Sequence, residues 1–430
     1  MIRRTALIVL LLVAAACTSS DGGPEPRPTA TAGGASGPTT TEPPSSGSPS
    51  PDEPPVSSIE LVAPRGGSFL VHGRYPLVDS DCVDPTQPRL DGRYPGTLVV
   101  ERADDGTFSL VATIPFDAYL EGIAEVPASW PRAALEAQAI AARTYALATT
   151  GWSGKEGAEL EEPICSTSAC QVYGGMPIDR TRLDRRWDRA VRDTDGQVLL
   201  FEGRPAETLY FSTSNGQTYG NEDVFGSAPL PYLRPVVERD DGASGLSHWS
   251  TRIRYRDLAT FLRAAGEWGE DEIIAVFRLA GGEVAVRGAV ESETMDLSTF
   301  RDAVNAWAHC LEPQRYPGSL PTTIPSRWFR IASTRGGVTI TGRGWGHGVG
   351  MVQWGAYGKA RRGLSAEEIL AYYYGGLRPE RYPEPGLIHV EIADGLRSLR
   401  LDPSGPGAEV DGEPVEGPIV IREGLELLVG

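Results

Sequence analysis

Apolar and polar residues alternate over much of residues 59–117, a pattern that predicts strands joined by turns. Two apolar runs in this region, 96–100 and 108–112, flank the turn sequence Asp104-Asp105-Gly106. Acidic residues followed by glycine between two such runs favour a β-hairpin. The N-terminal part of the chain is therefore expected to be β-rich.

Other stretches carry features typical of helices. A run rich in alanine begins at Pro131 and continues to about residue 149, and proline suits the first turn of a helix because no backbone N–H is needed there. Residues 256–265 and 297–309 also have a helical pattern. Ser365, with Glu368 three positions later, predicts a capping box at the start of a further helix.

The first residues have the composition of an export signal. Arg3 and Arg4 precede the apolar residues 6–16, a run too short to span a bilayer as a helix, and Cys17 follows directly. The sequence Ala-Ala-Ala-Cys that ends at Cys17 is similar to a bacterial lipoprotein cleavage box. We therefore expect residues 1–17 to be a lipoprotein signal peptide, with the lipid on Cys17; a plain secretory signal with an incidental cysteine is the alternative.

The rest of the chain divides by composition. Residues 18–58 contain no Leu, Ile, Phe, Tyr or Trp and are dominated by Pro, Ser, Thr and Gly, so we expect a disordered tether. Residues 59–385 form the predicted main domain, with a variable insertion at about 240–325, and 386–430 are a small β-rich segment.

Charge and cysteine content narrow the possible partners. The formal net charge of −17 argues against nucleic acid and against adsorption to anionic lipid, which leaves the lipid anchor as the expected membrane contact. After Cys17, an even number of cysteines remains, which in an exported protein suggests disulfides. We predict the pairs Cys165–Cys170 and Cys82–Cys310.

Glu125 is the first candidate for chemistry. It lies between the β-rich part and the long predicted helix, among Ile123, Val126, Pro127 and Trp130. Apolar surroundings of this kind disfavour the carboxylate and raise its pKa, which a general acid working near neutral pH needs.

Three blocks of sequence in order resemble one family, the stage II sporulation protein D family, whose peptidoglycan-cleaving domain also occurs in amidase-enhancer proteins. The blocks are 119–146, then 211–216 with 222–226 and 229–233, then 342–351 with 353–358. The resemblance implies an α+β fold with a β-rich N-terminal part, a central catalytic helix and a two-lobed groove. It also implies peptidoglycan glycan strands as substrate and no cofactor, and it allows a cell-wall amidase as a partner. Because an acidic chain has no electrostatic attraction to an anionic wall, binding there should depend on shape and stacking.

By this resemblance, Glu125 occupies the catalytic position of a lytic transglycosylase. Such an enzyme needs only one carboxylate, since the C6 hydroxyl of the sugar makes the attack that a second group supports in hydrolases. The alternative is a helix-entry residue favoured by the helix dipole. Glu121 is the rival acid, and we expect it to be solvated, like Glu136 and Asp117.

The remaining candidates are substrate-binding residues in the same blocks. In the glycine-rich block, close backbone approach is expected to let Trp345, His347 and Trp354 face sugar rings, with Gln353 bonding their polar groups. A structural histidine is the alternative for His347. Arg143 and Tyr145 either fix a carboxylate or hold the helix. The other candidates are Gln138, Ser212, Ser214 and Asn215.

Some members of the resembled family bind zinc near the first cysteine pair. No histidine occurs here between His72 and His248, so no metal is expected and a disulfide is favoured.

The leading hypothesis is a lytic transglycosylase that cleaves the MurNAc–GlcNAc bond outside the cytoplasmic membrane, either lipid-anchored or secreted to the wall. A non-catalytic enhancer of a separate N-acetylmuramoyl-L-alanine amidase is the second hypothesis. A serine hydrolase is the third, although no Gly-x-Ser-x-Gly elbow surrounds Ser212 or Ser214.

Overall fold

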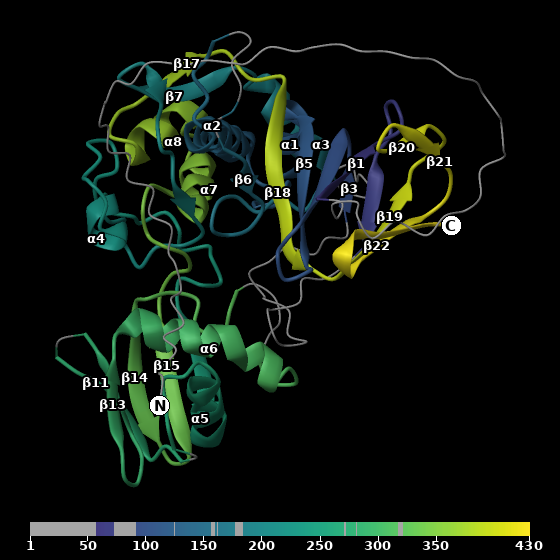
Figure 1. Ribbon diagram of the computed structural model, residues 1–430. Coiled ribbons are helices and arrows are strands. Elements are labelled where there is room, and N and C mark those ends of the chain that lie inside the picture. Colours follow the sequence, from purple (N-terminus) through teal and green to yellow (C-terminus); the bar gives the residue numbers. More distant parts are fainter. Residues whose placement is uncertain are drawn as a thin grey trace, which may run out of the picture. The chain divides into compact units, whose positions relative to one another are not determined.

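A seven-stranded mixed sheet organises the first part of the molecule (Figure 1). The computed structural model describes residues 57–72, 92–123, 125–155, 160, 162–176, 184–270, 272–280, 282–316 and 321–430. The predicted signal peptide, most of the tether, Cys17 and Cys82 lie outside these residues. The strand order is β21 (Glu413–Val415), β20 (Ala408–Val410), β1 (Ser58–Val62), β4 (Thr97–Arg102), β5 (Phe108–Pro115), β18 (Leu387–Leu396) and β6 (Ile164–Cys165).

The predicted hairpin is confirmed, because β4 and β5 pair antiparallel from Thr97–Thr113 to Arg102–Phe108. Residues 386–430 are strand-rich as expected, but their strands join the N-terminal sheets. Strand β18 pairs with β5, so the last part of the chain completes the sheet that the first part begins. A second sheet, of five strands, also combines strands from the N-terminal and C-terminal parts of the chain. Its order is β23 (Glu426–Val429), β22 (Ile419–Arg422), β19 (Ser398–Pro403), β2 (Phe69–His72) and β3 (Gly92–Tyr94).

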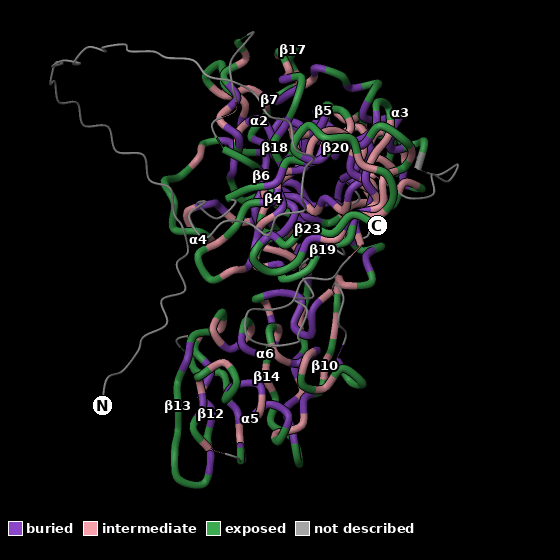
Figure 2. The backbone as a smooth tube through the Cα atoms, turned by 45° about the vertical axis from the view of Figure 1, so that its right-hand side comes forward, coloured by how far each residue is buried: buried purple, intermediate pink, exposed green. Residues whose placement is uncertain are grey.

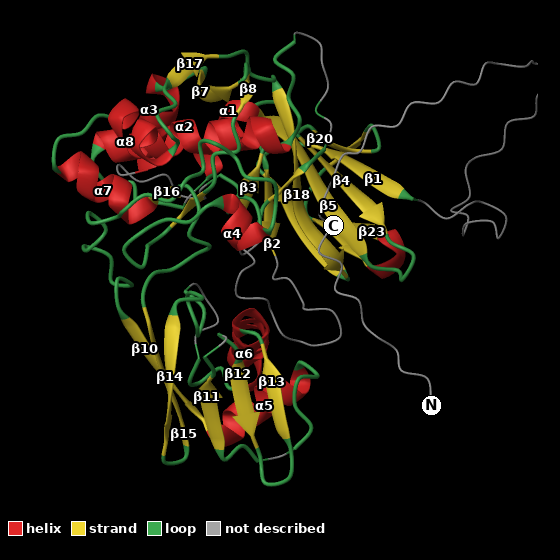
Figure 3. Ribbon diagram, turned by 90° about the vertical axis from the view of Figure 1, so that its left-hand side faces the viewer, coloured by secondary structure: helices red, strands yellow, loops and turns green. Residues whose placement is uncertain are grey.

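Helix α2 (Arg132–Thr149) is the central helix that the sequence predicted, with Pro131 as its N-cap residue. Most of its residues from Ala134 to Leu147 are buried, because alanine side chains allow neighbouring elements to approach closely. Figure 3 shows the helices gathered beside the strands. Those in contact with α2 are α1 (Phe116–Gly122), α3 (Asp184–Asp193), α7 (Gln353–Arg361) and α8 (Ala366–Tyr373). The predicted capping box at Ser365 is present and opens α8.

The residues from β10 to β15 build a second hydrophobic cluster of their own (Figure 2). The predicted helices are present as α5 (Tyr255–Ala264) and α6 (Leu297–Leu311). The cluster draws on residues from Ile253 to Ile340, so this core extends past the expected insertion at about 240–325. Its strands are β10 (Trp249–Arg254), β11 (Ala275–Arg278), β12 (Val284–Arg287), β13 (Ser292–Met295), β14 (Phe329–Thr334) and β15 (Gly337–Gly342).

These sheets and helices make an α+β fold, as expected, and the two-lobed groove stays a prediction. The Cys165–Cys170 disulfide is present, with its Cα atoms 5.6 Å apart, so these two sulfurs are not thiolate ligands for a metal. Cys310 is also disulfide-bonded. Its predicted partner Cys82 lies outside the described residues, so that pairing stays a prediction. Within the described part of the chain, no helix is long and apolar enough to cross a membrane.

Candidate active site

Glu125 follows α1 and precedes α2, on a short loop that Ile123 joins to Tyr173 by an isolated β-bridge. The residue is half-buried, and donors from three distant segments meet at its carboxylate. The backbone N–H of Val172 donates to Oε1 at 2.7 Å, and Gln353 Nε2 donates to Oε2 at 3.2 Å. The Tyr210 hydroxyl is hydrogen-bonded to the same carboxylate. The loop therefore places one carboxyl group where three polar partners converge.

Burial dominates the acidity of Glu125. Removal from water raises its pKa from 4.5 to about 7, because the charged form loses more hydration than the neutral form. The hydrogen bonds from Val172, Gln353 and Tyr210 act in the opposite direction and lower the pKa. Among the described residues, no second carboxylate is one of the groups that shift it. Glu125 can consequently hold a proton near neutral pH and also exist as a stabilised carboxylate after giving it up.

A chain of hydrogen bonds fixes the direction in which Tyr210 donates. Tyr119 donates its hydroxyl proton to Gln171 Oε1 at 2.7 Å, which orients the Gln171 amide. Gln171 Nε2 then donates to the Tyr210 hydroxyl oxygen at 2.9 Å and to the Ala142 carbonyl at 3.1 Å. Since the Tyr210 oxygen accepts from Gln171, its own proton is free to point at Glu125.

The second and third sequence blocks meet beside this carboxylate. Strand β9 (Tyr210–Phe211) pairs parallel with β16 (Met351–Val352), and α7 begins immediately afterwards at Gln353. The Gln353 amide donates to Glu125 and, at 3.5 Å, to Gln138 Oε1 on α2. Glu125 and Gln138 from the first block and Gln353 from the third thus lie together.

The glycine-rich block shows the close backbone approach that the sequence predicted. Gly344, Gly346, Gly348 and Gly350 have φ values of 79°, 108°, 93° and 75°, a region that side chains with a Cβ rarely occupy. A Cβ at Gly346 would lie 2.7 Å from the Cβ of Phe211, and one at Gly350 would overlap the Leu209 carbonyl oxygen. Glycine is therefore required at these positions for the block to lie against β9.

His347 is held as a neutral ring. Its Nδ1 accepts from the Val349 N–H at 3.2 Å, so Nε2 carries the proton and donates to the Tyr210 carbonyl at 2.8 Å. Burial lowers the pKa of His347 to about 4. With both ring nitrogens occupied, the geometry favours the structural interpretation.

The two tryptophans of the block have different surroundings. Trp345 pairs its backbone with Thr213. Trp354 packs its ring against Trp130, with centroids 4.9 Å apart, and against Tyr357 at 5.3 Å. Trp130 precedes α2, so this aromatic group joins the first and third blocks.

Ser212, Ser214 and Asn215 form a hydrogen-bonded turn. Ser214 is buried and donates to Asp241 Oδ2 at 2.7 Å, while Ser212 Oγ lies 3.1 Å from Thr213 Oγ1. Asn215 Nδ2 donates to the Tyr219 hydroxyl at 2.7 Å. Within the described residues, neither serine bonds a histidine, which gives a serine nucleophile no base.

Arg143 and Tyr145 point to structural roles. The Arg143 side chain is 1% exposed and its Nε lies 2.5 Å from Glu384 Oε1, with further bonds to Thr194 and to the Val191 carbonyl. Tyr145 is also buried, and burial raises its pKa. Of the two interpretations for this pair, holding the helix is the one that these contacts favour.

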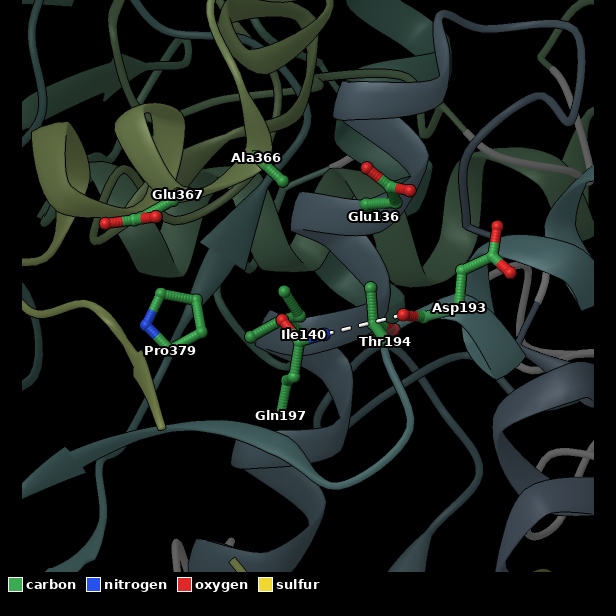
Figure 4. Close-up of a pocket in the computed structure, with 8 residues that line it drawn as sticks. All are labelled: Glu136, Ile140, Asp193, Thr194, Gln197, Ala366, Glu367 and Pro379. Carbon is green, nitrogen blue, oxygen red and sulfur yellow. Dashed lines mark hydrogen bonds between the residues drawn. The ribbon is translucent and has the colours of Figure 1, made fainter. Parts of the chain in front are cut away.

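The other acids near α2 have separate partners. Glu121 Oε1 accepts from Arg192 at 3.0 Å, and Asp117 bonds the Ala118 N–H. Glu136 lines a small pocket of about 180 Å³ with Asp193 and Glu367 (Figure 4). Arg132 pairs with both Glu136 and Asp193, and Arg378 pairs with Glu367, so each of these three carboxylates has a cation beside it. We assign no function to this pocket.

Sequence reasoning missed Val172 and Tyr210 as partners of Glu125, and Gln171 as the partner of Tyr210. Tyr210 directly precedes the second block, and Gln171 and Val172 follow Cys170 directly. Their contribution depends on a backbone N–H and on a relay of side chains, which no residue pattern specifies. The available signal was their position beside a recognised block and a predicted disulfide.

Comparison with known proteins gives a consistent result. The family model described as stage II sporulation protein matches residues 104–201, which include Glu125 and Val172. An uncharacterized protein of Brachyspira hyodysenteriae is 29% identical over 287 residues, covering 66% of this chain and 71% of its own length. Stage II sporulation protein D of Bacillus subtilis is 28% identical over 289 residues, covering 62% of this chain and 74% of the relative. The amidase enhancer of Bacillus subtilis is 27% identical over 292 residues, covering 59% of this chain and 38% of the relative.

Proposed function

We propose that this chain, which belongs to the stage II sporulation protein D and amidase-enhancer family, is a peptidoglycan lytic transglycosylase that uses Glu125 as its single acid and base. The family connects the chain with the cell wall. The proposal of lytic transglycosylase activity is supported above all by the half-buried Glu125 carboxyl, whose pKa of about 7 lets it hold a proton at neutral pH.

In the proposed reaction, the bond between C1 of N-acetylmuramic acid and O4 of N-acetylglucosamine breaks. Glu125 gives its proton to the departing O4, and the resulting carboxylate accepts the proton of the C6 hydroxyl as that oxygen bonds to C1. The product is a 1,6-anhydro sugar, and no water is consumed. The bonds from Val172, Gln353 and Tyr210 support this cycle, because they stabilise the carboxylate between its two proton transfers.

The test is digestion of purified glycan strands by wild type and Glu125→Gln, with products identified by mass spectrometry. We expect 1,6-anhydro ends from wild type and a loss of about 10²–10⁴-fold in the variant, the usual contribution of a general acid. Glu121→Gln is the matched control, since that acid lies four residues away in an ion pair with Arg192. Full activity of Glu125→Gln would refute the assignment, and reducing ends in the products would indicate a hydrolase.

A second candidate function is stimulation of a separate cell-wall amidase. The similarity to an amidase enhancer over 292 residues favours it, as does a site without a second carboxylate around Glu125 among the described residues. Pure protein that binds sacculi, releases no fragments and accelerates an added amidase would support this function over the first.

We also propose that Cys17 carries a lipid that anchors the protein on the outer face of the cytoplasmic membrane. The motivating feature is the Ala-Ala-Ala-Cys sequence after an apolar run. Fractionation of cells that express wild type or Cys17→Ser tests this. Wild type should sediment with membranes and the variant should not; identical fractionation would contradict the lipid anchor.

A further inference from the structure

A cavity of about 400 Å³ lies next to the glycine-rich block, and its volume is in the range of small-ligand sites. Its lining includes Trp345, His347 and Ser168. It also includes Arg301, Thr322 and Arg327, which lie within the sequence range of the second hydrophobic cluster. The inserted part of the chain, from which the sequence predicted no chemistry, therefore supplies both arginines of this cavity.

The charge of the cavity is opposite to that of the protein. Its described lining has two arginines and no aspartate or glutamate, in a chain of net charge −17. Burial lowers the pKa of Arg301, Asp302 acts against this shift, and the nearby Arg327 charge makes a smaller contribution that lowers the pKa. The two guanidinium groups are thus close enough to repel each other, and an anion between them would relieve that repulsion.

The neighbouring carboxylates leave much of this charge available. Arg301 Nη1 pairs with Asp302 at 2.9 Å, but the Asp302 side chain is 64% exposed. Asp296, at the start of α6, is already bonded by Ser298 and Thr299. Arg327 is exposed, and among the described residues it has no ion pair. The Arg327 guanidinium is therefore available to a ligand, and the Arg301 guanidinium is only partly neutralised by Asp302.

Two short series of contacts link the lining of the cavity to the Glu125 site. His347 bonds the Tyr210 carbonyl, and the Tyr210 hydroxyl bonds Glu125, so one residue separates the two. Ser168 lies in the Cys165–Cys170 loop, and Val172 just beyond this loop donates to Glu125. A chain-like ligand at Glu125 has this cavity as its neighbouring subsite.

We propose that Arg301 and Arg327 bind a carboxylate of the glycan strand, in a subsite where Trp345 contacts a sugar ring. The proposal rests on the proposed function, because it takes the strand at Glu125 as the ligand. Guanidinium groups match carboxylates in geometry as well as in charge, and aromatic rings pack on the apolar faces of sugars. Two carboxylates are available on such a strand: the lactyl group of a muramic acid without its peptide, and the carboxylates of an attached stem peptide.

Binding measured by calorimetry tests the subsite, with Glu125→Gln as the background so that the strands remain intact. The ligands are glycan strands stripped of peptides, strands that bear them, and uncharged oligomers of N-acetylglucosamine. Arg327→Gln should weaken binding of at least one acidic strand about tenfold, as expected for loss of one charge-assisted hydrogen bond, and should leave the uncharged oligomer unchanged. Arg330→Gln, an exposed arginine outside the cavity lining, is the matched control.

An effect confined to stripped strands identifies the lactyl carboxylate, and one confined to peptide-bearing strands identifies the stem peptide. Unchanged binding of both acidic strands to Arg327→Gln and to the double variant with Arg301→Gln would overturn the subsite, as would an equal loss for the uncharged oligomer. Failure of the proposed function looks different: wild type would then cleave no strand, while the arginine dependence of binding could still be measured.

Discussion

At the scale of single residues, the raised pKa of Glu125 suits the proposed proton transfer but lowers the stability of the folded protein at high pH. Its folded pKa of about 7 lies above the ordinary 4.5, so the folded protein binds this proton more tightly than the unfolded chain does. Stability from this group is therefore complete below pH 4.5 and decreases as the pH rises through about 7. The shift corresponds to about 3 kcal/mol above that window.

Glu125→Gln should consequently raise the melting temperature at pH 8, and its advantage over wild type should disappear near pH 4.5. Thermal unfolding followed by circular dichroism across this range measures the difference. Glu121→Gln, which breaks the ion pair with Arg192, should not gain stability at pH 8. If Glu125→Gln and wild type have the same melting temperature at every pH, the Glu125 carboxyl is not held in a low-dielectric site.

Tyr210 allows a second test at this scale. Its hydroxyl bond lowers the pKa of Glu125, so Tyr210→Phe should raise that pKa and move the alkaline limb of the pH–rate profile to higher pH. The measurement is the rate of strand cleavage from pH 5 to 9. Tyr232→Phe, another buried tyrosine whose hydroxyl bonds the Glu207 N–H, should leave the limb in place. Identical pH–rate profiles for Tyr210→Phe and wild type would show that the Tyr210 hydroxyl does not affect the pKa of Glu125.

At the scale of elements, the Cys165–Cys170 loop lies directly before the segment whose Val172 N–H donates to Glu125, and we expect the disulfide to hold that donor in place. Replacing both cysteines by serine should lower the free energy of unfolding by about 2 kcal/mol, the value expected for a loop this short. The loss of a well-placed donor should also raise the pKa of Glu125, because the bond from Val172 lowers it. Urea denaturation and the pH–rate profile of the double variant measure the two effects. A stability loss without any change in the profile would mean that Val172 keeps its position unaided.

Elements and contacts differed in how far the sequence could predict them. The β4–β5 hairpin, α2, α5, α6 and the Ser365 capping box depend on local chemistry, and the sequence was sufficient for them. The pairing of β18 with β5 joins residues about 280 positions apart, and the Tyr119–Gln171–Tyr210 relay joins three elements. Such contacts are decided by packing of the whole chain, so they became visible only in the structure.

At the scale of the whole molecule, α7 connects the candidate active site with the segment that leads to the inserted part. Gln353 at its start contacts Glu125, and Lys359 near its end is 3% exposed and pairs with Glu238 at 3.0 Å and Asp240 at 3.1 Å. Those acids lie in the segment that leads from the first cluster to β10. Tyr373 also donates to Glu238. The same short helix therefore holds the candidate active site and the entry to the inserted part.

Lys359→Met should destabilise the fold by about 3–5 kcal/mol, because it leaves the buried Glu238 carboxylate without its cation. Adding Glu238→Gln should recover much of this loss, since the uncompensated charge is then gone. Urea denaturation of the single and double variants measures both. If Lys359→Met and wild type have the same urea midpoint of unfolding, the buried Lys359–Glu238 pair does not stabilise the contact between α7 and the segment that leads to β10.

The glycine-rich block has a consequence for how the protein can diversify. Left-handed positions alternate from Gly344 to Gly350, and any substitution there introduces a Cβ into backbone conformations that resist one. Of the intervening positions, His347 is held by bonds from both ring nitrogens and Val349 is fully buried, so Trp345, which lines the cavity, is the one whose side chain can be exchanged most readily. Mutational scanning should therefore show low tolerance at all four glycines and at His347 and Val349, with a single tolerant position at Trp345. Variation at Trp345 can change the cavity wall while the backbone path of the loop stays constant.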